Sequence, residues 1–149
     1  MILSKFASLS LLFCGLFAMT SQASAQVSVH DAWVRATVPG QHATGAFMQI
    51  VSTTDGKLVD VGSPAAKLVQ IHQMVMNNDV MSMQQVAEVK LPAGTKVALE
   101  PSSYHVMLMD LNQQIKEGDE VPFTLTVEDA AGQRQIINVS APARALNAE

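Results

Sequence analysis

Short runs of apolar and β-branched residues alternate with turn residues along most of the chain, at a spacing of about eight to twelve positions. No stretch keeps a helical apolar period for three turns. The pattern predicts strands over Ser28–Arg35, Gly45–Ser52, Lys57–Val61, Leu68–Met76, Val80–Val89, Thr95–Glu100, Tyr104–Leu111, Pro122–Glu128 and Gln133–Ser140. Strands this short and this evenly spaced favour an all-β Greek-key sandwich or barrel of about eight or nine strands. The tail from Pro142 to Glu149 is expected to be loose.

The first 25 residues have a different pattern from the rest. Lys5 precedes an apolar run from Leu9 to Met19, and Ala23 and Ala25 supply the small residues that a signal peptidase requires. The run is too short to span a bilayer, which needs about 20 apolar residues, and no later segment approaches that length. We therefore expect a cleaved secretory signal over residues 1–25 and a single exported domain over residues 26–149, with no membrane span.

Charge and cysteine content exclude several classes of function. Removal of the signal takes away Lys5 and moves the formal net charge from −4 to −5, and the remaining bases are scattered singly, so no nucleic-acid partner is expected. The one cysteine, Cys14, lies inside the signal after the bulky Phe13, which argues against lipid attachment. A mature chain without a thiol can form no disulfide, cysteine–zinc cluster, cysteine nucleophile or thiolate copper centre.

Methionine is concentrated in two predicted strand regions. Four methionines flank the turn at Asn78–Asp79, two more lie in the Tyr104–Leu111 strand, and one histidine accompanies each group: Met74, Met76, Met81, Met83, Met107 and Met109, with His72 and His105. Methionine at strand spacing most often fills a core. The alternative is that these methionines are metal ligands. The predicted pairing of the strands helps to decide between the two roles.

A two-residue loop at Asn78–Asp79 fixes the register of the predicted hairpin. Met76 then lies opposite Met81, Met74 opposite Met83, and His72 opposite Gln85. Because residues two apart in a strand share a face, the histidine and all four methionines of the hairpin project to one side. His105 and Met107 likewise share a face of their own strand. Two imidazoles and two thioethers can meet at one ion if that strand crosses near the hairpin.

The donor types select the metal. Thioethers are soft and neutral and suit Cu(I), whereas calcium and magnesium prefer hard oxygen ligands and zinc favours thiolate, imidazole and carboxylate. A blue-copper electron-transfer site needs a cysteine thiolate, which the mature chain lacks. The residues therefore favour Cu(I) binding, and whether Cu(II) also binds stays open.

The spacing of these residues resembles the ligand motif of the PCu(A)C-type periplasmic copper chaperones. Ten residues separate His72 from Met83, twenty-one separate Met83 from His105, and one separates His105 from Met107. The opening Asp31–Ala36 and the segment Leu99–Pro101 are also similar to that family, and the resemblance covers residues 28–141. It implies a cupredoxin-like β-sandwich with a surface Cu(I) site whose ligands are His72, Met83, His105 and Met107.

The same resemblance implies a function and partners. The family carries periplasmic copper and helps load the copper-bearing subunit of cytochrome c oxidase, in some cases beside a thiol-bearing copper chaperone. No catalysis is expected, because the chain shows no nucleophile–base pair and no phosphate loop. Two alternatives stay open: a periplasmic copper-buffering or tolerance protein, and an extracellular β-sandwich interaction module whose methionine face binds a protein.

The remaining polar and sulfur residues have simpler interpretations. Met74 either packs against Met83 or substitutes for it as a ligand. Met76, Met81 and Met109 are expected to form an apolar apron around the ion, or to hold it transiently. We expect structural or surface roles for His30 and His42, a core position for Trp33, and a solvated loop for the acids Glu117, Asp119 and Glu120.

Overall fold

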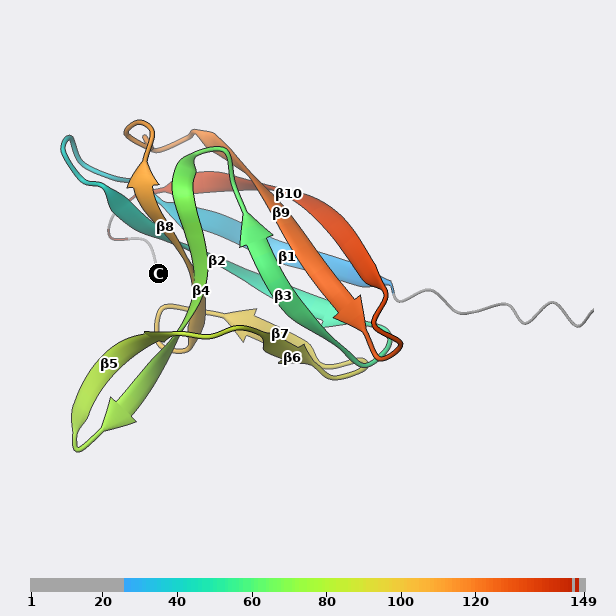
Figure 1. Ribbon diagram of the computed structural model, residues 1–149. Coiled ribbons are helices and arrows are strands. Elements are labelled where there is room, and N and C mark those ends of the chain that lie inside the picture. Colours follow the sequence, from blue (N-terminus) through green and yellow to red (C-terminus); the bar gives the residue numbers. More distant parts are fainter. Residues whose placement is uncertain (1–25, 146, 148–149) are drawn as a thin grey trace, which may run out of the picture.

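A computed structural model describes residues 26–145 and residue 147, and the signal expected over residues 1–25 lies outside this part of the chain. Its regular structure consists of strands: β1 (Val27–Arg35), β2 (Ala43–Ser52), β3 (Gly56–Gly62), β4 (Ala66–Asn77), β5 (Val80–Gln85), β6 (Val89–Leu91), β7 (Lys96–Leu99), β8 (Tyr104–Leu111), β9 (Glu120–Asp129) and β10 (Arg134–Arg144) (Figure 1). Within the described residues, no helix is long and apolar enough to cross a membrane.

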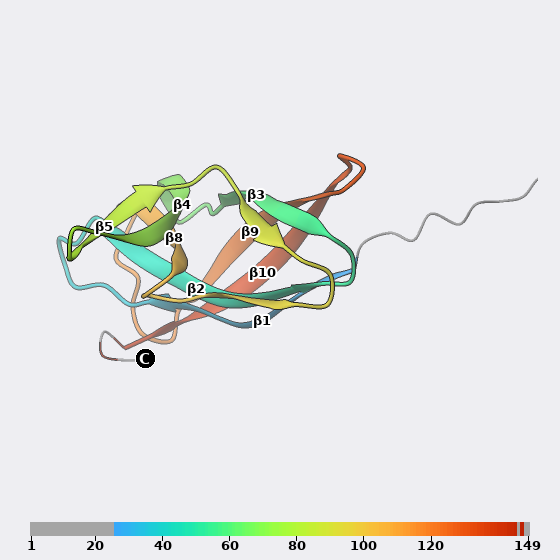
Figure 2. The same cartoon turned by 90° about the horizontal axis from the view of Figure 1, so that it is seen from below.

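The strands follow the order β5-β4-β8-β7-β2-β1-β10-β9-β3-β6, with β8 also pairing with β2. Most neighbouring strands are antiparallel. A parallel pairing of β1 with β10 joins one half of the sheet, from β5 to β1 in this order, to the other half, from β10 to β6. Figures 1 and 2 show the halves stacked over each other. Alternate residues from both, such as Val34, Ile50, Val106 and Leu125, are fully buried in one core. The predicted cupredoxin-like all-β fold is confirmed.

Two local predictions need correction. The segment Val80–Val89, predicted as one strand, is divided into β5 and β6, because the chain leaves β4 after Gln85 and crosses over to pair with β3. The tail from Pro142 is not loose at its start, since β10 continues to Arg144 and pairs with β1 there. Alanine and proline have low β propensity, so this stretch gave no strand signal although Ala143 is buried.

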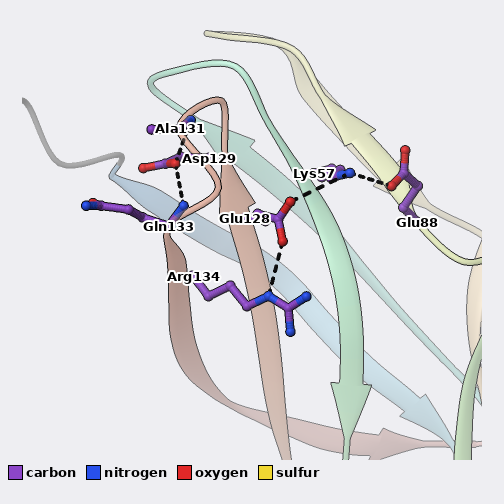
Figure 3. Close-up of polar contacts among 7 residues, drawn as sticks. All are labelled: Lys57, Glu88, Glu128, Asp129, Ala131, Gln133 and Arg134. Atoms are coloured by element: carbon purple, nitrogen blue, oxygen red, sulfur yellow. Dashed lines mark hydrogen bonds and ion pairs between the residues drawn. The ribbon is translucent and has the colours of Figure 1, made fainter.

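Ion pairs and a closed turn organise the end of the molecule that lies away from β5 (Figure 3). Lys57 Nζ lies 2.8 Å from Glu88 and 3.7 Å from Glu128, and Arg134 Nε donates to Glu128 over 3.1 Å. The hydrogen bond that Lys57 donates to Glu88 raises the pKa of Lys57. Asp129 accepts the amides that follow it and so closes the β9–β10 turn. Water screens these exposed and partly exposed pairs, so the buried core supplies most of the stability.

The β4–β5 hairpin has the register that the sequence predicted. Asn77 pairs with Val80, and the methionine pairs follow outward from this turn. Asn78 and Asp79 both have positive φ, 48° and 61°, as a two-residue type I′ turn requires. The hairpin projects from the body of the molecule in Figure 1, and β5 pairs with β4 alone.

We expect Asp79→Gly to stabilise the hairpin by about 0.5–1 kcal/mol, because glycine adopts positive φ without a steric penalty from Cβ. Asp79→Val should destabilise it by about 1–2 kcal/mol, since a β-branched residue is strained there. Amide hydrogen exchange at Ser82 and Val75 measures both effects. Equal exchange rates in the two variants would contradict the assigned turn.

Candidate metal centre

The pairing of β4 with β8 brings the two groups of histidine and methionine together. His72 lies opposite His105, and Gln70 lies opposite Met107. Because residues opposite each other in an antiparallel ladder share a face, both histidines and Met107 lie on one face of the sheet, and the hairpin register adds Met74 and Met83 to it. Intervening residues of the same strands, such as Ile71 and Val106, face the core. The strands thus separate packing residues from metal donors.

His105 presents a ring nitrogen to the sulfur of Met83. The side chain is only 5% exposed, and its Nδ1 lies 3.3 Å from the carbonyl oxygen of Ser103. A carbonyl only accepts hydrogen bonds, so Nδ1 carries the proton of the neutral ring and Nε2 keeps its lone pair. Nε2 lies 2.9 Å from Met83 Sδ. Two lone-pair donors this close, with a polar partner fixing the far side of the ring, are arranged to bind one soft cation.

His72 repeats this arrangement with its nitrogens exchanged. Its Nε2 lies 2.9 Å from Gln70 Oε1, which makes Nε2 the proton-bearing atom. Its Nδ1 is buried and has no hydrogen-bond partner. The two imidazole rings are 6.1 Å apart between centroids. An unpaired buried nitrogen normally carries a free-energy penalty, and a bound metal ion would remove it.

Both histidines are held in the neutral form that metal binding requires. Burial lowers the pKa of His72, and the nearby His105 lowers it further. Burial also lowers the pKa of His105, against an opposing effect of its hydrogen bond to Ser103. A lowered pKa keeps the ring lone pair free at neutral pH, so a cation need not displace a proton.

A cavity of about 290 Å³ lies beside these residues and is lined in part by Met74, Met83, His105 and Met107. His72 is not among its lining residues and lies next to His105 instead. The sequence left two roles open for Met74, and its place in the cavity wall is compatible with either. Met83, on the outer strand of the hairpin, is 47% exposed, so one side of the site is open to solvent.

An aromatic layer behind His105 was missed by sequence reasoning. The Phe47 ring lies 6.3 Å from the His105 ring and 4.6 Å from that of Trp33, and the Arg35 guanidinium lies over Phe47 at 5.6 Å. Trp33 is buried as expected, but in this layer on the outer face of the sheet. A Cβ at Gly45 would come within 2.9 Å of the Phe47 ring, so this glycine makes room for it. A glycine inside a predicted strand, two residues before an aromatic, was the available signal.

The residues expected to have simple roles lie in ordinary surroundings. His30 is exposed and hydrogen-bonds to Ser28, and His42 is exposed in the loop before β2. Asp119 accepts from the amide of Lys116, and Glu120 accepts from Ser140. Among the residues that the structure describes, no three His, Cys, Asp or Glu side chains converge on a common point.

Comparison with known proteins identifies the family. Residues 27–141 match the family described as "Putative lipoprotein LpqE-like". The chain belongs to this LpqE-like family, which is of the PCuAC type. A relative in Leifsonia xyli subsp. xyli, Lxx21020, is 34% identical over 70% of this chain, and RP573 of Rickettsia prowazekii is 30% identical over 77%. The chain spans 64% of the length of Lxx21020 and 67% of that of RP573.

Solved structures similar to this LpqE-like protein are PCuAC domains. A copper-bound PCuAC domain from PmoF2 superposes with a TM-score of 0.64 at 23% identity, covering 80% of this chain and 92% of that domain. Apo-DR1885 from Deinococcus radiodurans gives a TM-score of 0.59 at 26% identity over 97% of both chains. The CuI form of DR1885 gives 0.59 at 28% identity, covering 81% of this chain and 78% of that one.

We expect Gly45→Ala to lower the free energy of unfolding by about 1–3 kcal/mol, because the new methyl group would displace the Phe47 ring from between Trp33 and His105. Gly62→Ala is the matched control, since a Cβ there meets nothing within 4 Å. Urea-induced unfolding of both variants measures the difference. Equal stabilities would show that the aromatic layer is not tightly packed.

Proposed function

We propose that this protein is an exported, Cu(I)-binding metallochaperone that holds one copper ion on the outer face of β4, β5 and β8. The observation that carries the proposal is the 2.9 Å approach of His105 Nε2 to Met83 Sδ, together with a His72 ring 6.1 Å from the His105 ring whose buried Nδ1 lacks a partner. Each of these atoms has an unshared lone pair, and none receives a proton from a neighbour. A soft cation satisfies all three at once.

The proposed ligands are His72, Met83, His105 and Met107. Two neutral imidazoles and two neutral thioethers suit Cu(I), which tolerates soft uncharged donors and has no strong geometric preference. Met107 lines the same cavity as Met83 and His105, and so does Met74. The existence of a CuI form of DR1885, which is 28% identical to this chain, supports the choice of metal. Cu(II) is a secondary possibility that the same donors bind less well.

Several features suit a carrier that must release its ion. The site lies at the surface, and Met83 is half exposed on a strand that pairs with one neighbour. An acceptor can therefore replace Met83 first, while the buried His105 still holds the ion. The copper stays Cu(I) throughout, because one neutral ligand replaces another and no electron moves. These steps describe binding and transfer, with no catalysed reaction.

The proposed acceptors are the copper-bearing subunit of cytochrome c oxidase, a thiol-bearing copper chaperone, or both. A thiolate binds Cu(I) more strongly than a thioether, which gives transfer a direction. We place the protein in the periplasm, with a cleaved signal over residues 1–25 and a single copper-binding domain over residues 26–149. The name of one relative, "Putative lipoprotein Lxx21020", is consistent with export of this family.

Cu(I) titration under reductant, in competition with a chromophoric chelator, tests the site. The protein should bind one tight equivalent. Met83→Leu, Met107→Leu and His105→Asn should each weaken it by about 100-fold or more, because loss of even an outer partner of a metal ligand costs about 10–100-fold.

His42→Gln and Met109→Leu are the matched controls for this titration. Each removes a donor of the same type from outside the proposed set, so each should leave the affinity unchanged. If the protein never competes with the chelator, the copper proposal is wrong, and the methionine face would then be a protein interface.

A deletion strain separates delivery from buffering, the second candidate function. Delivery predicts that cytochrome c oxidase activity falls at low copper and returns when copper is added, because only the supply is limiting. Growth and oxidase activity across a copper series measure this. Normal oxidase activity at low copper, with sensitivity only at high copper, would support buffering instead.

A further inference from the structure

Two methionines at the tip of the hairpin, Met76 and Met81, lie outside the hydrophobic core. Met76 is 65% exposed and Met81 is 46% exposed, although methionine is normally chosen to fill gaps in a core. They lie opposite each other next to the turn, on a hairpin that projects from the body of the molecule (Figure 1). Because their sulfurs are not needed to fill the core, the thioethers are available to bind a ligand.

The thioethers of the tip all lie on one face of the hairpin. Met76 and Met81 form one cross-strand row, and Met74 and Met83 form the next row toward the site. The residues between them, Val75 and Ser82, pair on the opposite face and contain no sulfur. Sulfur is therefore confined to the face that bears the two histidines.

The spacing within these rows allows a shared ion. Directly opposed residues in an antiparallel pair have Cβ atoms about 4.5–5.5 Å apart, and diagonal neighbours lie within about 7–8 Å. Long, flexible side chains such as methionine can close both distances onto one cation. Met83 is turned toward His105, which leaves Met74 as the third thioether within reach of the tip pair.

We propose that Met76 and Met81, with Met74 as a shared third ligand, form a second and weaker Cu(I) site at which the ion first binds. This inference rests on the proposed function and adds an entry step to it. From the tip site, Met83 replaces Met81, His105 and His72 then replace Met76 and Met74, and Met107 is added as the fourth ligand. Each step exchanges or adds a neutral donor, so the charge and oxidation state of the ion do not change.

The order of affinities follows from the donors. A site made of thioethers alone binds Cu(I) through soft but weak donors, whereas the inner site adds two imidazoles, which are stronger donors. Exposure is 65% at Met76, 46% at Met81 and 47% at Met83, and it falls to 5% at His105. The ion thus moves from an accessible, weak site to a protected, stronger one.

Cu(I) titration of Met76→Leu/Met81→Leu, beside the unsubstituted protein, tests this inference. Competition with a chromophoric chelator counts the equivalents, and the methionine methyl resonances identify which side chains the ion contacts. We expect a tight equivalent followed by a weaker one, with the Met76 and Met81 signals shifting only during the second. The double variant should lose the weaker equivalent, keep the tight one, and take up copper severalfold more slowly from a weak donor.

Val80→Leu is the matched control, since it changes an equally exposed apolar side chain of the tip and leaves every sulfur in place. A single equivalent in all three proteins, with unshifted tip methyl signals, would overturn the entry site and leave the proposed function standing. Loss of the weaker equivalent in Val80→Leu would also overturn it, because the tip would then act through its apolar surface. Absence of the tight equivalent from every protein would instead refute the proposed function.

Discussion

The antiparallel register between β4 and β8 is the constraint on which the rest of the site depends. It places His72 opposite His105 and, through the hairpin, sets Met83 against the same histidine. Because side chains alternate between the faces of a strand, a slip of β4 by one residue would turn His72 into the core and Ile71 out to solvent, and would separate His72 from His105. The buried apolar residues of these strands hold the register and thereby hold the donors. Packing and metal chemistry are thus coupled without sharing a residue.

The two faces of this sheet are stabilised in different ways. On the inner face, aliphatic side chains from both halves of the strand order form a continuous core. On the outer face, Phe47 lies beside His105 and Trp33 packs against Phe47, with Arg35 above the ring of Phe47. This second layer excludes water from one imidazole and leaves the other side open toward the hairpin. The His105 ring is therefore fixed in position, whereas Met83 keeps the freedom of an exposed side chain.

The sequence predicted local features of this protein better than long-range ones. The hairpin could be derived in full, since the Asn78–Asp79 turn sets its register and period-two alternation sets its faces. The pairing of β8 with β4 could not be derived, because many residues separate the two strands and neither has a local signal that specifies its partner. The family resemblance supplied that step. The division of Val80–Val89 into two strands, the extension of β10 through Pro142 and the role of Phe47 all depend on tertiary pairing. Such features cannot be predicted from a short window of sequence, because they depend on residues far away in the chain.

The graded exposure of the methionines has a consequence for oxidative damage. Thioethers are oxidised to sulfoxides in order of their accessibility to the oxidant, and a sulfoxide presents a polar oxygen in place of a soft sulfur lone pair. Met76 and Met81 would be modified before Met74 and Met107, which lie on the same face with less exposure. Under peroxide stress Met76 would be oxidised first, Met81 and the ligand Met83 would be about equally vulnerable at 46% and 47% exposure, and the less exposed Met74 and Met107 would be spared. Repair by methionine sulfoxide reductases would then need to reach only the part of the protein that projects furthest from its body.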